Sequence, residues 1–184
     1  MSTTFIDMTE AEILQQLDFA IRRPRAAAFL ASLANDLETA LSDEPTLRLA
    51  WRSVPLCAYD SLPDGIESSW VFALRADCTS GAERHPNSIQ RVMSYRGSAD
   101  MQLWNGKAWD SHRMASGADR TFDTRWLSIP DNVWHKPVMS GENWVVVSFH
   151  TAADDALIEE RAADDAHPDA GTTTSELYVG REAR

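Results

Sequence analysis

Two patterns of apolar residues divide this chain into a helical beginning and a strand-rich body. Through the first forty or so residues, apolar side chains recur every three or four positions, which is typical of helices with one buried face. Thr9 and Glu12 match a capping box at the start of the first helix. Pro24 is expected to separate that helix from a second one. We therefore predict a helical N-terminal extension over residues 1–46, packed on the body.

From Leu47 to about His150 the apolar residues form short runs rich in Val, Trp, Phe and Tyr, bounded by Pro, Gly, Asp or Asn. This pattern is typical of strands in an antiparallel sandwich or barrel. The runs cover residues 46–54, 68–77, 90–97, 100–106, 120–130 and 143–151. Asn105-Gly106 is a strong signal for a tight hairpin. The predicted fold class is all-β, a small antiparallel β-barrel of the jelly-roll type over residues 47–151.

Residues 152–184 differ from both preceding parts because they are acidic and nearly free of aromatic side chains. We expect a short helix around Leu157 and Ile158 that continues as an acidic C-terminal tail. The stretch 176–180 suits an edge strand or a contact with a neighbouring subunit. The three parts together are expected to form one structural domain.

The charge of the chain argues against two kinds of partner. The formal net charge is -11 over 184 residues, whereas nucleic acids and anionic membranes attract proteins through Lys and Arg. We expect neither partner. No segment approaches the ~20 apolar residues needed to span a bilayer, and the N-terminus lacks the pattern of a signal peptide. With only two cysteines, a cytoplasmic location is expected.

A short polar segment contains residues with metal-binding chemistry. Glu83 and His85 are two positions apart, so that on a strand both side chains point to one face. Gln90 opens the next strand after a turn, and His135 leads into a strand much later in the chain. If these segments converge, two imidazoles, a carboxylate and an amide oxygen could bind a divalent metal. Two His and one carboxylate form the ligand set of non-haem Fe(II) oxygenases.

Each of these residues also has a plainer interpretation. His85 precedes a proline and suits an exposed turn, while His135 suits a buried histidine bonded to a backbone carbonyl. Gln90 could orient a substrate or a ligand without touching the metal. Glu83 could act as a general base if a metal is held elsewhere. The joint spacing of the two histidines favours the metal site.

Other polar residues are candidates for substrate contacts. Arg75 and Arg91 could hold a carboxylate or phenolate at the mouth of a barrel, with a surface salt bridge as the alternative for each. His150 shares a strand face with Trp144 and could line the cavity, but its place at the strand end favours a position at the rim. The tryptophans are expected mainly in the core, although some could line a pocket for an aromatic ligand.

The first polar segment resembles motif one of the cupin superfamily, whose members are small RmlC-like β-barrels. That motif has His-x-His, a Glu four or five positions later and a Gly seven positions after the Glu. Here Glu83-x-His85 is followed by Gln90 and Gly97 at those spacings. This sequence departs from the motif because Glu83 stands in place of the first His and Gln90 in place of the Glu.

The later segment resembles motif two of the same superfamily, in which Pro-x-Gly is followed by a His three residues after the Gly. Here Pro130-x-Asn132 precedes His135 at that spacing. Asn replaces the Gly, and Asn also tolerates a positive φ. Met139 occupies the position of the usual Asn.

The resemblance to single-domain bacterial-type cupins implies a metal-dependent enzyme acting on a small organic substrate, anionic or aromatic, inside the barrel. It favours Fe(II), with Zn, Mn or Ni as alternatives, and a homodimer. The expected metal ligands are His85, His135, Glu83 and Gln90, and the expected catalytic residues are Glu83, Arg75 and Arg91. The favoured activity is that of a non-haem Fe(II) dioxygenase. The alternatives are a metal-dependent lyase, isomerase or hydrolase, and a non-catalytic ligand-binding cupin that has lost its metal.

Overall fold

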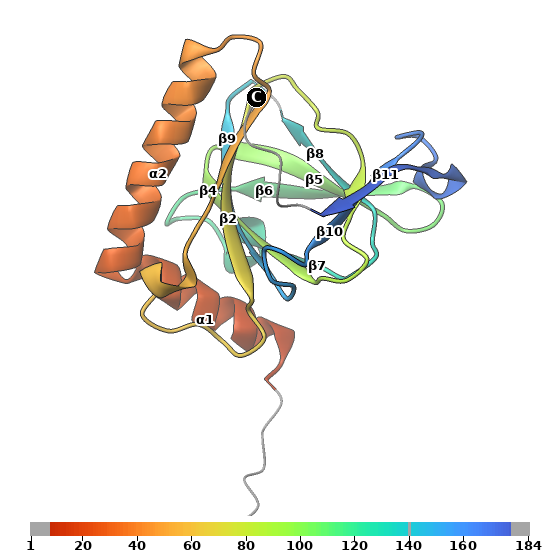
Figure 1. The fold of residues 1–184 in the computed structure, drawn as a ribbon. Helices are drawn as coiled ribbons and strands as arrows, with labels where there is room; N and C mark the ends of the chain where they lie inside the picture. Colours follow the sequence, from red (N-terminus) through yellow and green to blue (C-terminus); the bar gives the residue numbers. More distant parts are fainter. Residues whose placement is uncertain (1–7, 140, 178–184) are drawn as a thin grey trace, which may run out of the picture.

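The computed structural model describes residues 8–139 and 141–177. Two antiparallel sheets face each other, and two helices cover the outer face of one of them (Figure 1). The first sheet has the order β1-β2-β9-β4-β7, and the second has the order β11-β10-β3-β8-β5-β6. The all-β fold class predicted from the sequence is therefore confirmed. No helix among the described residues is long and apolar enough to cross a membrane.

The elements follow one another along the chain in a nearly continuous run of strands. The helices are α1 (Glu10–Arg22), α2 (Pro24–Asp43) and α3 (Phe122–Arg125), with 3-10 turns at Leu56–Ala58 and Pro168–Ala170. The strands of the first sheet are β1 (Leu49–Ser53), β2 (Ser68–Leu74), β4 (Gln90–Arg96), β7 (Trp126–Ile129) and β9 (Trp144–His150). Those of the second sheet are β3 (Glu83–Arg84), β5 (Ser98–Trp104), β6 (Trp109–Ala115), β8 (His135–Met139), β10 (Ile158–Ala162) and β11 (Thr172–Leu177).

The helical extension begins and breaks where the sequence predicts. Thr9 and Glu12 form the complete capping box of α1, and Pro24 opens α2 directly after the first helix. Both helices pack on the first sheet through one apolar cluster that includes Leu30, Leu37 and outward residues of β2 and β9. Every residue of β2 and β9 is consequently buried, because helices cover one face of these strands and the second sheet the other.

Strand β9 contributes side chains to both apolar clusters inside the protein. Val145, Val147 and Phe149 belong to the cluster under the helices. Trp144 and Val146 belong to a second cluster between the sheets. The alternation follows from the two-residue period of a strand. It places the later residues of the second face, including His150, inside the protein as well.

Two turns need unusual backbone geometry, and the sequence provides for both. Gly97 joins β4 to β5 with φ +72, and a Cβ there would overlap the carbonyl oxygen of Asn143. Asn132 has φ 61 in the turn before β8. Asn tolerates this left-handed conformation better than most residues, so that the replacement of the expected glycine is structurally sound.

The C-terminal segment differs from the prediction. Residues around Leu157 and Ile158 do not form a helix, and the expected acidic tail contains the antiparallel pair β10–β11, of which β10 also pairs with β3. Most side chains of β11 are exposed, so its polar sequence gives no alternating apolar signal. The edge strand predicted over 176–180 is described only in part. Glu176 and Leu177 end β11, which lies at the edge of the second sheet, and residues 178–180 lie outside the described residues. The predicted run 120–130 was also partly wrong, because α3 precedes β7 there.

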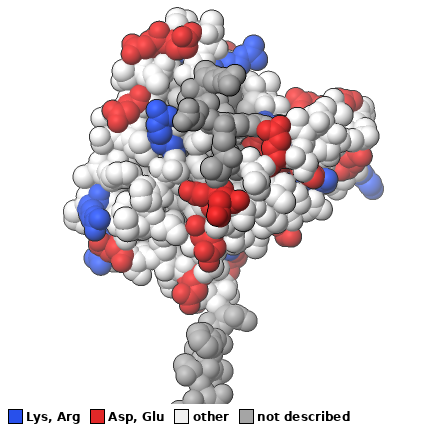
Figure 2. Space-filling model, viewed as in Figure 1, with Lys and Arg blue, Asp and Glu red and all other residues white. Residues whose placement is uncertain are grey.

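Charged groups on the surface agree with the acidic composition. On the face drawn in Figure 2, acidic side chains are spread over the molecule and the described Lys and Arg side chains are scattered among them. The described side chains on this face form no basic surface of the kind that neutralises phosphates.

Candidate metal centre

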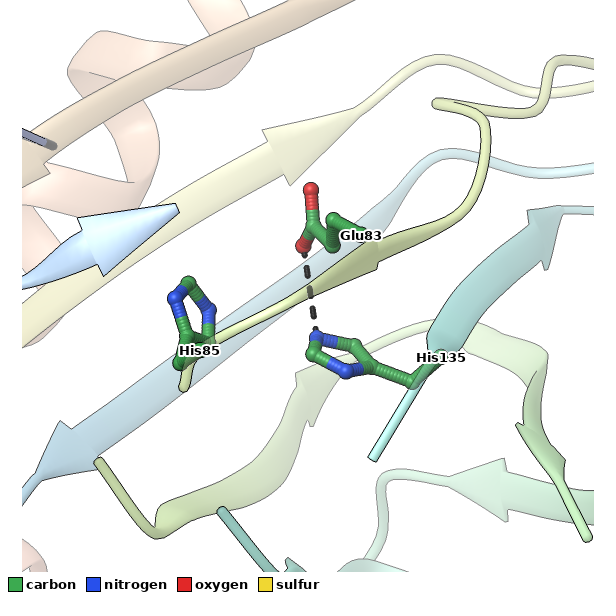
Figure 3. A group of neighbouring side chains, drawn as sticks. All are labelled: Glu83, His85 and His135. Atoms are coloured by element: carbon green, nitrogen blue, oxygen red, sulfur yellow. Dashed lines mark ion pairs between the residues drawn. The ribbon is translucent and has the colours of Figure 1, made fainter. Parts of the chain in front are cut away.

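Strands β3 and β8 bring the two sequence motifs together. Glu83 on β3 lies opposite His135 on β8 in the antiparallel register. Just beyond this pair, the backbone N–H of Asn132 donates a hydrogen bond of 2.9 Å to the carbonyl oxygen of His85. Figure 3 shows the resulting group, with Glu83 and His135 pointing toward each other and His85 beside them.

Glu83, His85 and His135 form a compact group of potential ligands. One ligand atom from each of the three side chains lies within 4.8 Å of the other two. The His85 and His135 ring centroids are 5.5 Å apart, and His135 Nε2 is 3.5 Å from Glu83 Oε1. Both histidines are buried, with exposed fractions of 3% and 1%. The exposed-turn interpretation of His85 is therefore wrong.

Backbone carbonyls determine which imidazole nitrogen of His85 and His135 carries the proton. His85 Nδ1 lies 3.0 Å from the carbonyl oxygen of Ile158, and His135 Nδ1 lies 3.0 Å from that of Val133. A carbonyl oxygen only accepts hydrogen bonds, so each Nδ1 carries the proton. The neutral ring then has its lone pair on Nε2. Metal-binding histidines commonly have this second hydrogen bond, which orients the ring.

Arg161 on β10 holds the carboxylate of Glu83. Its Nη2 is 2.7 Å from Glu83 Oε2, and its Nε is 2.7 Å from Oε1 of Glu159. A third bond, from Nη1 to the carbonyl oxygen of Ser80, orients the guanidinium. Burial alone would raise the pKa of Glu83, but the charge of Arg161 outweighs burial and holds that pKa well below its usual range. Glu83 is thus an ionised carboxylate with Oε1 directed to the histidines.

Two histidines near Glu83, His85 and His150, are neutral at ordinary pH. Burial lowers the pKa of His85 to about 4. Burial also lowers the pKa of His150 well below its usual value. His150 is 1% exposed and its ring centroid is 5.0 Å from that of His85. The prediction that it lies at the rim is therefore wrong.

Gln90 also faces this region. It is 7% exposed, and in the sheet register it lies opposite His150. Its Oε1 is a buried atom without a hydrogen-bond partner among the described residues, as is Nε2 of His135. Buried polar atoms are rarely left unpaired. The donor set of two imidazoles, one carboxylate and one amide oxygen thus suits a divalent metal.

A small apolar cavity adjoins the group. Its volume is about 40 Å³, and Glu83, Gln90 and Arg161 form its polar end. Its remaining wall is mostly apolar and includes Leu49, Phe72, Leu74, Met101, Trp144 and Val146. A second pocket of about 240 Å³ shares Leu49, Leu74, Ser80 and Arg161 with it. The two pockets are therefore neighbours.

The structure brings neither of the two candidate arginines to this group. Arg75 donates hydrogen bonds to the carbonyl oxygens of Leu47 and Glu44 beyond the end of α2. Arg91 points to the helices, where its guanidinium makes two bonds to Glu10 at 2.7 and 2.8 Å. The salt-bridge alternative describes Arg91, and Arg75 supports the connection between α2 and β1.

Sequence reasoning missed three residues of the site. Arg161 and Glu159 lie in the segment expected to be a tail, and only their two-residue spacing on one strand face could have connected them. His150 was placed on the correct strand face, but the depth of that strand in the protein cannot be deduced from its alternation alone.

Comparisons with known proteins give matches among solved structures only. No family model matches the sequence, and no curated protein does. An oxalate oxidase in complex with glycolate is 13% identical, with 58% of this chain and 52% of that chain covered and a TM-score of 0.46. Pumpkin seed globulin is 16% identical, with 66% of this chain and 30% of that chain covered and a TM-score of 0.49. KdgF from Halomonas sp. is 13% identical, with 59% of this chain and 84% of that chain covered and a TM-score of 0.43. The match thus spans about half of the oxalate oxidase chain.

Together, the two facing sheets and the position of both motifs define a cupin-like fold with a candidate metal centre. The two histidines stand at the places that the cupin resemblance implies for ligands. The residues around them differ, because Glu83, Gln90 and Arg161 provide the polar groups.

Proposed function

We propose that this chain is a metal-dependent cupin enzyme that acts on a small organic molecule, and that its activity is that of a non-haem Fe(II) dioxygenase. The observation that carries the proposal is the shared geometry of His85 and His135. Each has Nδ1 bonded to a backbone carbonyl, and one nitrogen of each ring lies within 4.8 Å of a carboxylate oxygen of Glu83. This is the 2-His-1-carboxylate ligand set of non-haem Fe(II) oxygenases.

In this proposal His85, His135 and Glu83 hold the metal, and Gln90 either contributes its amide oxygen or orients the substrate. A bound Fe(II) would supply a Lewis acid and a site for O2 and substrate. Arg161 keeps Glu83 ionised and directs Oε1 to the histidines. The apolar wall of the cavity excludes water and takes the body of a small substrate, whereas the polar end receives its carbonyl, carboxylate or phenolate group.

A non-catalytic ligand-binding protein is the second candidate. The specific observation in its favour is the ion pair of Glu83 with Arg161, because the protein itself already supplies one cation to this carboxylate. In that case the cavity would bind a small apolar ligand without chemistry. A metal-dependent lyase, isomerase or hydrolase would use the same ligand set but consume no oxygen.

Metal content per chain tests the proposal. Full-length protein without an affinity tag is reconstituted with Fe(II) under anaerobic conditions, desalted and measured by plasma mass spectrometry beside His85→Ala and His135→Ala. We expect about one iron per wild-type chain, lost in both variants while circular dichroism shows that they fold. His112→Ala, which changes an exposed histidine on β6, is the control. Wild-type protein that remains metal-free would refute the enzyme proposal and leave ligand binding.

Oxygen consumption separates the enzyme classes. The iron-loaded protein is tested in an oxygen electrode with small carboxylates and phenols. Uptake that depends on both iron and substrate supports a dioxygenase, and substrate turnover without uptake supports the lyase, isomerase or hydrolase alternative. The proposal also includes a cytoplasmic homodimer, which light scattering coupled to size exclusion tests for its oligomeric state.

A further inference from the structure

His150 lies where a further metal ligand would be useful, although no sequence motif marks it. It ends β9 on the face directed at the second sheet, and only 1% of it is exposed. Its register partners are Ser68 on β2 and Gln90 on β4. The imidazole is therefore enclosed by neighbouring strands and stands next to Gln90 at the polar end of the cavity.

The distance between the rings agrees with ligands of one metal ion. The His85 and His150 centroids are 5.0 Å apart, and the His85 and His135 centroids are 5.5 Å apart. Imidazoles that share a tetrahedral metal at bond lengths of about 2.0–2.1 Å have ring centres roughly 5 Å apart. His85 thus has two histidine neighbours at suitable separations, one on β8 and one on β9.

The hydrogen bonds of His150 leave it free to adjust. Its Nδ1 is buried and has no hydrogen-bond partner within residues 8–139 and 141–177, and its Nε2 lies 3.3 Å from Ser148 Oγ, which is long for a hydrogen bond. The His150 nitrogens are outside the group whose ligand atoms all lie within 4.8 Å of one another. Ligation therefore requires a small movement of the ring, which the weak bond to Ser148 permits.

Three unpaired polar atoms belong to residues around Glu83 and His85. Among the described residues, His150 Nδ1, His135 Nε2 and Gln90 Oε1 are all buried without hydrogen-bond partners. They come from three different strands. Buried polar atoms are rarely left unpaired, so three together indicate a group that binds to them.

We propose that His150 is a third imidazole ligand of the metal centre, beside His85 and His135. The inference rests on the metal site of the proposed function and extends it. Glu83 occupies the position of one expected motif histidine, and β9 supplies an imidazole in its place from another part of the chain. The centre then has three neutral nitrogen ligands, and Glu83 is shared between the metal and Arg161.

Histidine nitrogen shifts measured with zinc test this proposal without any activity assay. Full-length protein labelled with 15N is loaded with Zn²⁺, and long-range 1H–15N spectra identify each imidazole nitrogen that binds metal. We expect a metal-bound nitrogen in His85, His135 and His150, and none in the exposed His112 and His167.

A variant provides the second measurement. His150→Gln should weaken Zn²⁺ binding by at least about 100-fold in a chelator competition, because losing a ligand exceeds the 10–100-fold effect of outer groups. Ser148→Ala, which removes only the partner of His150, should change it little. Metal-bound shifts at His85 and His135 alone, with unchanged affinity of His150→Gln, would overturn the third ligand and leave the metal site standing. Absence of Zn²⁺ binding by wild-type protein would overturn both.

Discussion

Arg161 and Glu83 form an ion pair of 2.7 Å at the polar end of the cavity, and this pair connects strand β10 to the candidate metal centre. The same guanidinium also bonds Glu159, a carboxylate that is only 2% exposed. One cation thus serves two acidic groups, and the position of Glu83 depends on a residue 78 positions later in the chain (161 minus 83).

Replacing this arginine should strongly destabilise the protein. Arg161→Met leaves Glu83 and Glu159 without their shared cation, and breaking a buried ion pair of this kind costs about 3–5 kcal/mol. The matched control is Arg84→Met, because Arg84 pairs with Glu160 between the same two strands at a similar exposure, whereas Arg161 serves two carboxylates, one of them fully buried. We expect a smaller loss for Arg84→Met, because it leaves no fully buried carboxylate without its cation. Urea unfolding of the metal-free proteins measures both, and equal losses would contradict a special role for Arg161.

Glu83 should contribute directly to metal affinity. Glu83→Gln keeps the shape of the side chain but removes the charge that faces His135. We expect the Kd for Fe(II) or Zn²⁺ to rise by about tenfold or more, whereas Glu160→Gln on the neighbouring strand should leave it unchanged. Competition with a chromophoric chelator measures both constants. An unchanged Kd for Glu83→Gln would remove it from the ligand set and favour its interpretation as a general base.

Metal-free protein should lose stability as the pH falls from about 6.5 to 4. The pKa of His85 is about 4 in the folded protein against 6.5 normally, so in this window the unfolded state binds more protons and stability increases with pH. His150 acts in the same direction. Because the pKa of Glu83 is lowered, its contribution is lost below about pH 4.5.

Each group that is protonated in the unfolded state but not in the folded state changes the free energy of unfolding by about 1.4 kcal/mol per pH unit. Urea unfolding at several pH values measures the slope of the free energy of unfolding against pH. We expect His85→Gln to reduce this slope by about that amount, and His112→Gln to leave it unchanged. A wild-type stability that is flat across the window would show that the histidines are not neutral and buried in solution.

Arg91 should stabilise the helical extension without affecting the metal centre. Its side chain is 6% exposed and pairs with Glu10 at the start of α1. Arg91→Met should lower the free energy of unfolding by about 1–3 kcal/mol and leave metal binding and kcat unchanged. Loss of activity in a folded, metal-loaded variant would instead restore Arg91 as a substrate-binding residue.

The sequence predicts the layers of this fold well because apolar periodicity determines them. The capping box, the break at Pro24 and the two faces of β9 could all be deduced from spacing. The pairing of Glu83 with His135 also agrees with the spacing of the two motifs. Each residue stands a few positions from a turn, and these turns limit how β3 and β8 can align.

The remaining features depend on contacts that no local pattern records. Arg161 is partly exposed and lies in an acidic segment, so its sequence context is that of a solvated tail. Arg75 and Arg91 have the same residue type as Arg161 and stand closer to the motif, yet both bond to parts of the helical extension. Which guanidinium reaches Glu83 is decided by the pairing of β3 with β10, which joins residues far apart in sequence.

That pairing has a consequence for the order in which the protein matures. The carbonyl oxygen of Ile158 orients His85, and Arg161 orients Glu83, so β10 supports two of the three potential ligands. During synthesis from the N-terminus, both motifs leave the ribosome before β10 does. A nascent chain that ends before β10 contains every potential ligand but lacks the groups that orient His85 and Glu83. If the site binds a metal as proposed, the complete arrangement of ligands forms only after β10 has been synthesised.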